Sequence, residues 1–211
     1  MKEQIVFTHK FEQSLSDSIA KCNPDKIFVL ADDTTIGMCY NRIKHFECLK
    51  KAQSITIPSA DVNKNLSSLS CVWKVLQTAK ATRHSMLINI GGGMVTDLGG
   101  FAAATFKRGI NFVNVPTTLL AMVDASVGGK TGINFGGLKN EIGAFAFPQI
   151  VIIDTQWLET LDRENLLSGY AEMLKHGLIS NERMWAELLN FDLGEPNWGR
   201  LQQMVAQSVR V

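Results

Sequence analysis

Short, almost wholly apolar runs alternate along the first 150 residues with segments whose apolar residues recur at helical spacing. The runs predict strands in KIFVLADDTT, SITIPSAD, SMLINI, NFVNVP and QIVIIDTQWLETL. LSSLSCVWKVLQTAKAT has the spacing of an amphipathic helix. Strands that are apolar on both faces and alternate with helices indicate a parallel sheet covered by helices on both sides. We therefore expect an α/β fold.

The pattern becomes wholly helical from Arg163 onward, in RENLLSGYAEMLKHGLISNERMWAELLNF and NWGRLQQMVAQSVRV. We place a domain boundary between Asp154 and Arg163, which gives one domain over 1–157 and a second over 158–211. Neither glycine nor proline stops the last helical pattern. We therefore expect the second part to be the start of a longer all-helical domain.

Composition and charge exclude several classes of protein. The 211 residues are 45% hydrophobic and 19% charged, with a formal net charge of +1, as in an ordinary globular protein. The balanced charge gives no electrostatic case for nucleic acid or an anionic membrane, and no apolar run approaches spanning length. The four cysteines form no C-x-x-C pair, and the first residues lack a signal peptide. We expect reduced thiols in a cytoplasmic protein.

Three glycines, Gly91–Gly93, follow an apolar strand and open a helix. Backbone N–H groups at such a turn can bind a phosphate, and the helix dipole favours its negative charge. The G-x-G-x-x-G fingerprint fits only in part, because its third position holds Thr96, with Asp97 next. Gly99 and Gly100 then allow close approach to a sheet or a ligand. At this point a nucleotide site and a tight turn without a ligand both remain open.

The stretch DASVGGKTGIN ends like a phosphate-binding P-loop, in Gly129, Lys130 and Thr131. The first glycine of that motif should stand at position 124, which holds Asp124, and a carboxylate there would repel phosphates. The stretch also does not follow its strand directly. We therefore predict no ATP site of this kind, although Lys130 can still bind another anion or remain a surface charge.

Glu172, Lys175 and His176 are spaced so that all three share one face of a helix. A glutamate and a histidine four residues apart can supply two metal ligands. The alternative is a surface Glu–Lys pair beside an uninvolved histidine. The spacing alone leaves both open.

Four stretches together resemble the 3-dehydroquinate synthase family: GGGMVTDLGGFAAATFKRG, VPTTLLAMVDASVGGKTGIN, KNEIGAF and GYAEMLKHGLI. The resemblance is dense from about Asn89 to Ile179. It implies a Rossmann-like N-terminal domain, a helical C-terminal domain, and a site between them that holds NAD and a divalent metal, zinc or cobalt. It also implies a lyase of the shikimate pathway that converts 3-deoxy-D-arabino-heptulosonate 7-phosphate to 3-dehydroquinate and phosphate. The steps are oxidation by NAD, phosphate elimination, re-reduction and aldol cyclisation.

Carried over to this chain, the resemblance implies NAD contacts from Gly92, Gly93, Asp97, Thr117, Thr118, Lys139 and the stretch Trp157, Leu158, Glu159 and Thr160. It implies substrate contacts from Lys130, Asn140 and Lys175, and a contact from Asp124 to either the nicotinamide-side ribose or the substrate. In an expected homodimer, Arg108 would reach the phosphate within its own chain or across the interface. Glu172 would be a metal ligand.

The chain departs from the family pattern in two places. A D-G-E-x-x-K motif is replaced by SADVNK, in which Asp61 stands for the glutamate and Lys64 matches, and both are further candidate cofactor contacts. Members of the family are longer and take two more metal-binding histidines from the remaining helical domain, whereas His176 is not a ligand there.

With one of three ligands present, we expect this chain to bind NAD, to retain no metal and to be inactive. The alternatives are a related sugar phosphate cyclase of aminocyclitol synthesis and a nucleotide-binding module without catalysis.

Overall fold

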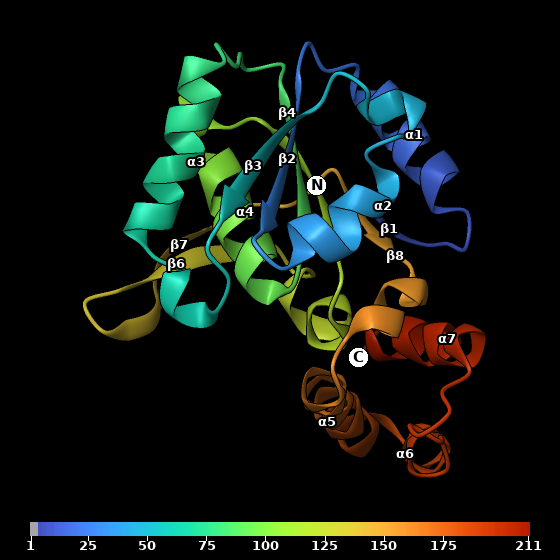
Figure 1. Cartoon of the computed structure of the whole chain (residues 1–211). Coiled ribbons are helices and arrows are strands. Elements are labelled where there is room, and N and C mark those ends of the chain that lie inside the picture. Colours follow the sequence, from blue (N-terminus) through green and yellow to red (C-terminus); the bar gives the residue numbers. More distant parts are fainter. Residues whose placement is uncertain (1–3) are drawn as a thin grey trace.

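The computed structural model describes residues 4–211, which form a six-stranded sheet with helices on both faces (Figure 1). The strand order is β1-β8-β5-β4-β2-β3, and all neighbouring strands run parallel. The strands are β1 (Gln4–Phe7), β2 (Ile27–Asp32), β3 (Gln53–Ile57), β4 (Met86–Gly91), β5 (Asn111–Pro116) and β8 (Ile150–Ile153). The predicted Rossmann-like parallel sheet is confirmed.

The apolar strands of the sheet face two separate hydrophobic clusters. Every residue of β4 is buried, and its side chains alternate between the two faces. Leu87 packs in the cluster formed with α3 (Leu66–Thr78) and α4 (Gly93–Thr105), whereas Ile88 packs on the other side. That opposite face carries α1 (Phe11–Cys22), the π-helical turn η1 (Ile36–Tyr40) and α2 (Asn41–Ile43). Burial on both faces explains why the strands lack alternation of apolar and polar residues.

Helix α4 lies unusually close to its neighbours, as its small residues predicted. A Cβ atom built on Gly99 would lie 2.0 Å from Asn89 Oδ1 of β4, and one on Gly100 would lie 2.5 Å from Thr131 Cγ2. Neither position has room for a side chain. The two glycines therefore let α4 contact the sheet on one side and a separate hairpin on the other.

Several elements differ from the sequence prediction. The sequence did not predict the hairpin, in which β6 (Lys130–Phe135) and β7 (Leu138–Phe145) pair antiparallel outside the main sheet. All but one residue of β7 is exposed, so no apolar pattern marked it as a strand. The β1 strand and α1 were not predicted either. The strand predicted in QIVIIDTQWLETL ends at Ile153, because Asp154 caps a 3-10 helix, η6 (Thr155–Thr160), by accepting a hydrogen bond from Gln156 N.

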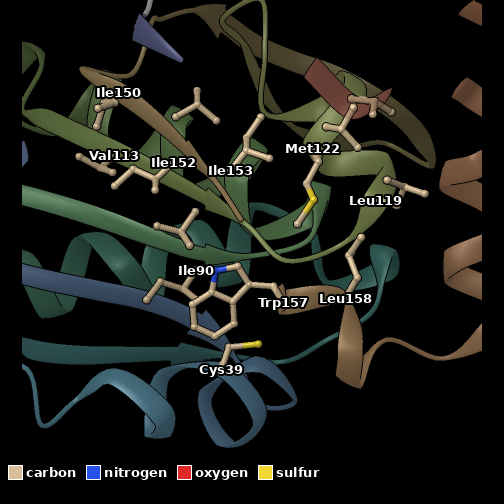
Figure 2. Packing of buried hydrophobic residues seen from close by; sticks show 14 of the residues in the cluster. Cys39, Ile90, Val113, Leu119, Met122, Ile150, Ile152, Ile153, Trp157 and Leu158 are labelled. Atoms are coloured by element: carbon tan, nitrogen blue, oxygen red, sulfur yellow. The ribbon is translucent and has the colours of Figure 1, made fainter. Parts of the chain in front are cut away.

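Three helices, α5 (Arg163–Ser180), α6 (Glu182–Leu189) and α7 (Trp198–Ser208), gather at one end of the sheet (Figure 1). Their buried residues belong to the same hydrophobic cluster as Leu119 and Met122, which lie beside Leu158 in Figure 2. The division into 1–157 and 158–211 stays a prediction, since this cluster crosses it. Across residues 4–211, the helices lack the combined length and apolarity that a bilayer crossing requires.

Candidate functional site

The glycine turn and the segment after β5 meet at the carboxyl ends of the central strands. Gly92 precedes α4 with no side chain to cap it, and a Cβ atom there would lie 3.0 Å from Thr118 Cγ2. A Cβ atom on Gly93 would lie 3.0 Å from Ala125 Cβ. Thr117 N donates to Gly91 O at 2.9 Å. The predicted residues Gly92, Gly93, Thr117 and Thr118 are thus together, at a helix N-terminus that suits a phosphate.

A pocket of about 430 Å³ opens beside this turn, between α4, the short helix η5 (Ala121–Ala125) and the β6–β7 hairpin. Its walls are Asp97, Asp124, Ala125, Lys130, Thr131, Gly132, Asn140, Gly143, Ala144 and Phe145. Four predicted site residues, Asp97, Asp124, Lys130 and Asn140, therefore share one cavity. Lys130 Nζ lies 3.7 Å from Asp124 Oδ1, and both side chains are about half exposed or more. The pocket thus offers a cation, two carboxylates and an amide to a polar ligand.

Lys64 is a buried cation behind the pocket, with only 7% of its side chain exposed. Its Nζ lies 3.0 Å from Asp97 Oδ2 and donates to Asn140 Oδ1 at 2.5 Å. Burial raises the pKa of Asp97, and the nearby Lys64 opposes that rise. Lysine is rarely buried without a partner. Lys64 therefore acts as the internal counter-charge of Asp97.

An ion pair and a hydrogen bond connect the β6–β7 hairpin, which forms one wall of the pocket, to the segment before α3. Lys139 Nζ lies 3.0 Å from Asp61 Oδ2, so two predicted cofactor contacts are paired with each other. Burial alone would raise the pKa of Asp61, but its contacts with Lys139 and Lys64 outweigh burial and lower it. Asn134 N donates to Lys64 O at 2.7 Å, which joins the hairpin to this segment.

The Glu172 cluster lies on α5, away from the pocket lining. Glu172 pairs with Lys175, and its Oε1 lies 3.3 Å from His176 Nε2. His176 Nδ1 in turn lies 2.6 Å from Ser208 Oγ of α7. Within residues 4–211, no three histidine, cysteine, aspartate or glutamate side chains are grouped to hold a metal ion. These residues do not by themselves fit a metal.

Lys175 links the cluster electrostatically to the pocket. Its hydrogen bond to Glu172 is the main reason that the pKa of Lys175 is raised, and the charge of Asp124 adds to the effect. Asp124 lines the pocket, and its charge acts on Lys175 of α5. Lys175 is therefore paired with Glu172 and also influenced by the charge of Asp124.

Other predicted residues lie apart from the pocket. Arg108 is exposed just before β5, at the amino ends of the strands, with a left-handed backbone (φ 64°). Trp157 and Leu158 are 5% and 1% exposed, and Figure 2 shows both side chains in the core cluster. A cofactor contact from these two would therefore come from their backbone. Glu159 Oε2 lies 3.9 Å from Arg42 Nη2, and Thr160 ends the same 3-10 helix.

Sequence reasoning had placed Lys64 among the cofactor contacts and had not connected it with Asn140. The two residues are 76 positions apart, and nothing in the local pattern signals their contact. The sequence assigns no role to two residues that contact candidate site residues: Asn134, which joins β6 to the Lys64 backbone, and Ser208, which contacts His176.

Known proteins resemble this chain along its whole length. A family model described as 3-dehydroquinate synthase N-terminal matches residues 54–168. The 3-dehydroquinate synthase of Parabacteroides distasonis is 47% identical over 210 residues, covering 100% of this chain and 60% of that protein. The chain therefore spans about 60% of the length of this curated relative.

Solved structures show the same fold at low sequence identity. A 2-deoxy-scyllo-inosose synthase complexed with carbaglucose-6-phosphate, NAD+ and Co2+ superposes with a TM-score of 0.87 at 21% identity, covering 98% of this chain and 58% of that one. A 2-epi-5-epi-valiolone synthase from Streptomyces hygroscopicus, with NAD+ and Zn2+ bound, gives 0.84 at 24% identity, covering 100% and 60%. These likenesses establish the fold, while the sequence matches establish the family. The chain belongs to the 3-dehydroquinate synthase family.

Proposed function

We propose that the chain supplies the NAD site and one wall of the substrate site of a 3-dehydroquinate synthase. That enzyme would convert 3-deoxy-D-arabino-heptulosonate 7-phosphate to 3-dehydroquinate and phosphate. One observation carries the proposal: Lys130 and Asn140 share a pocket with Asp97 and Asp124, directly beside a glycine turn at a helix N-terminus. Membership of the family supports it.

The residues of the turn fit a dinucleotide. Gly92 and Gly93 leave space where side chains would meet Thr118 and Ala125, so a pyrophosphate can approach the N–H groups that open α4. When bound, NAD would supply a hydride acceptor that takes a hydride from the carbon bearing a substrate hydroxyl and later returns it. Thr118, which lies next to Gly92, and Asp97 of α4 are the candidates to bind its ribose and amide groups.

The pocket residues suit a sugar acid. The exposed ammonium of Lys130 can pair with the substrate carboxylate, and the amide of Asn140 can donate to an oxygen. Asp124 beside Lys130 can accept from substrate hydroxyls. A polyhydroxy acid needs such a mixture of donors and acceptors, whereas a purely apolar ligand would leave these groups without partners.

Among residues 4–211, Glu172 has no companion ligands placed to hold a metal ion with it. The NAD+ and the Co2+ or Zn2+ named above belong to the neighbouring structures. We infer that this chain binds NAD without metal and does not complete the reaction. A cytoplasmic homodimer, with Arg108 of each subunit available to the other, is part of the same proposal.

Isothermal titration calorimetry tests the proposal. The chain is titrated with NAD, once with EDTA and once with zinc, and the two affinities should agree. Adding the heptulosonate phosphate to the NAD-loaded chain should give binding but no release of inorganic phosphate. A folded sample with no heat at millimolar NAD would contradict the nucleotide site, and steady phosphate release would contradict the inactive state.

A further inference from the structure

The contact between Lys64 and Asn140 fixes which end of the Asn140 amide faces the pocket. A lysine ammonium only donates hydrogen bonds, so the atom that it contacts must be the amide oxygen. The amide nitrogen is therefore at the other end of the group. Since Asn140 lines the pocket, its two N–H donors are available there.

The backbone of Asn140 is held in place as well. Asn140 adopts a left-handed conformation (φ 54°), which asparagine tolerates better than most residues. Its N–H donates to Asn134 Oδ1 at 3.0 Å, and Asn134 N donates to Lys64 O at 2.7 Å. Lys64 therefore contacts Asn140 directly through its side chain and indirectly through its carbonyl. Both the position and the rotation of the amide depend on Lys64.

Lys64 itself has little freedom to do anything else. Its side chain is 7% exposed, and its ammonium contacts Asp97 and Asn140 and lies 3.9 Å from Asp61 Oδ1. Lys130, by contrast, is 64% exposed and can reach a ligand directly. The buried cation is suited to positioning a neighbour, and the exposed one is suited to binding an anion.

We propose that Lys64 is a positioning residue for substrate binding, which holds the Asn140 amide so that its N–H donors face an anionic oxygen of the substrate. The inference rests on the proposed function and extends it, because Lys64 then acts through Asn140 and does not need to touch the cofactor. The pocket would select ligands that carry an acceptor at this point, such as the carboxylate of a sugar acid. A ligand with a donor there would leave two donors facing each other.

The first experiment tests the amide chemistry with the 211-residue chain. Asn140→Asp keeps an oxygen for Lys64 and replaces the N–H donors by a second oxygen, while Asn140→Ala removes both. With NAD present, calorimetry with the heptulosonate phosphate should show roughly tenfold or greater loss of affinity for Asn140→Asp, and a smaller loss for Asn140→Ala. Equal binding by Asn140→Asp and wild type would overturn the inference.

The second experiment tests whether Lys64 holds the amide. Removing Lys64 alone would leave the Asp97 carboxylate buried without a partner, so Asp97→Asn is the background and Lys64→Met is added to it. The 15N heteronuclear NOE of the Asn140 side-chain NH2 group should be high in Asp97→Asn and should fall in the double variant. In the same Asp97→Asn background, Lys64→Arg supplies a donor at this position again and should restore the high NOE of the Asn140 NH2 group. An unchanged NOE in the double variant would overturn the inference.

The two arms separate this inference from the proposed function. If wild type with NAD fails to bind the heptulosonate phosphate, the proposed function is wrong, and the NOE still decides whether Lys64 orients Asn140. If wild type binds and the Asn140→Asp variant binds equally, the function stands and the inference fails.

Discussion

The pocket beside the glycine turn and the Glu172 cluster on α5 hold their charged groups in different ways. In the pocket, Lys64 contacts Asp97 and Asn140, which come from α4 and the hairpin. Glu172 instead pairs with Lys175 and His176 of its own helix. Tertiary structure thus preorganises the pocket, whereas the Glu172 pairs form within one helix, with Ser208 of α7 contacting only His176. A ligand of Glu172 would first have to displace Lys175 from the carboxylate.

The two regions meet where α5 packs on the segment before η5. A Cβ atom on Gly169 would lie 2.4 Å from Leu120 N and 2.6 Å from Leu119 Cβ. The first of these is a backbone atom, which cannot move aside as the end of a flexible side chain can. Gly169 therefore sets the distance between α5 and the helix that carries Asp124.

The largest effect is expected from changing this contact. Gly169→Ala should lower the free energy of unfolding by about 2–4 kcal/mol, because the new methyl group must push α5 from Leu119 and Leu120. Urea unfolding followed by circular dichroism measures it. Gly37→Ala is the matched control, since nothing lies within 4 Å of a Cβ atom there, and it should be neutral or slightly stabilising. Equal stability of the two variants would mean that α5 is not fixed here.

A second, smaller effect should separate cofactor from substrate contacts within the pocket. Asp97→Asn, which keeps the shape of the side chain, should weaken NAD binding roughly tenfold, as expected for loss of a charge-assisted hydrogen bond. Lys130→Ala should change NAD affinity by less than about threefold, because its exposed ammonium is assigned to substrate. Calorimetry compares the two. The reverse ranking would show that their roles are exchanged.

The sequence predicted best where periodicity and burial coincide. The strand over Met86–Gly91 and the helix after it follow from an unbroken apolar run and a glycine turn. The sequence pattern did not predict the β6–β7 hairpin. Leu138–Phe145 pairs with β6 along one edge, and most of its side chains are exposed to solvent. Local patterns report burial, and a strand that is not buried gives no such signal.

In the candidate site, too, local motifs predicted some features, and contacts between distant segments could not be predicted. Motif resemblance named Asp97, Asp124, Lys130 and Asn140, and the fold brings all four into one pocket, while the roles implied for them stay predictions. It could not show that Lys64 bridges Asp97 and Asn140, since that depends on three segments meeting in space. For Trp157, the same resemblance could not show that the side chain is buried in the core, so that only the backbone is left to contact a cofactor.

Stability should depend on pH through Asp154, which stands between β8 and the 3-10 helix η6. Burial raises the pKa of Asp154, although Gln156 N and His9 favour its charged form. Because the pKa in the folded state lies above the unfolded value, the contribution to stability is fully present below the unfolded pKa. It is lost as the pH rises through the folded pKa. Asp154→Asn keeps the capping oxygen and removes this titration.

Thermal unfolding of the two proteins between pH 3 and pH 7 measures the difference. The melting temperature of Asp154→Asn relative to wild type should rise as the pH increases. His9 limits the gain, because its ring nitrogen lies 4.0 Å from Asp154 Oδ1 and its charge favours the ionised carboxylate. A constant offset across the range would show that burial does not perturb this carboxyl.

The smallest effect on stability is expected from changing Glu172, because its ion pair with Lys175 lies within one helix and is partly exposed. Glu172→Gln keeps an oxygen for Lys175 and removes the negative charge, so the raised pKa of Lys175 should fall toward its ordinary value. Asp124 should keep part of the rise, because its charge also acts on Lys175. NMR titration of the Lys175 side chain follows this change, while stability should change by less than about 1 kcal/mol, as for an exposed ion pair. The double variant Glu172→Gln with Asp124→Asn should then remove the remaining rise in the pKa of Lys175. If Glu172→Gln left the Lys175 titration unchanged, the pair would not persist in solution, and Glu172 would be free to bind a ligand without displacing Lys175.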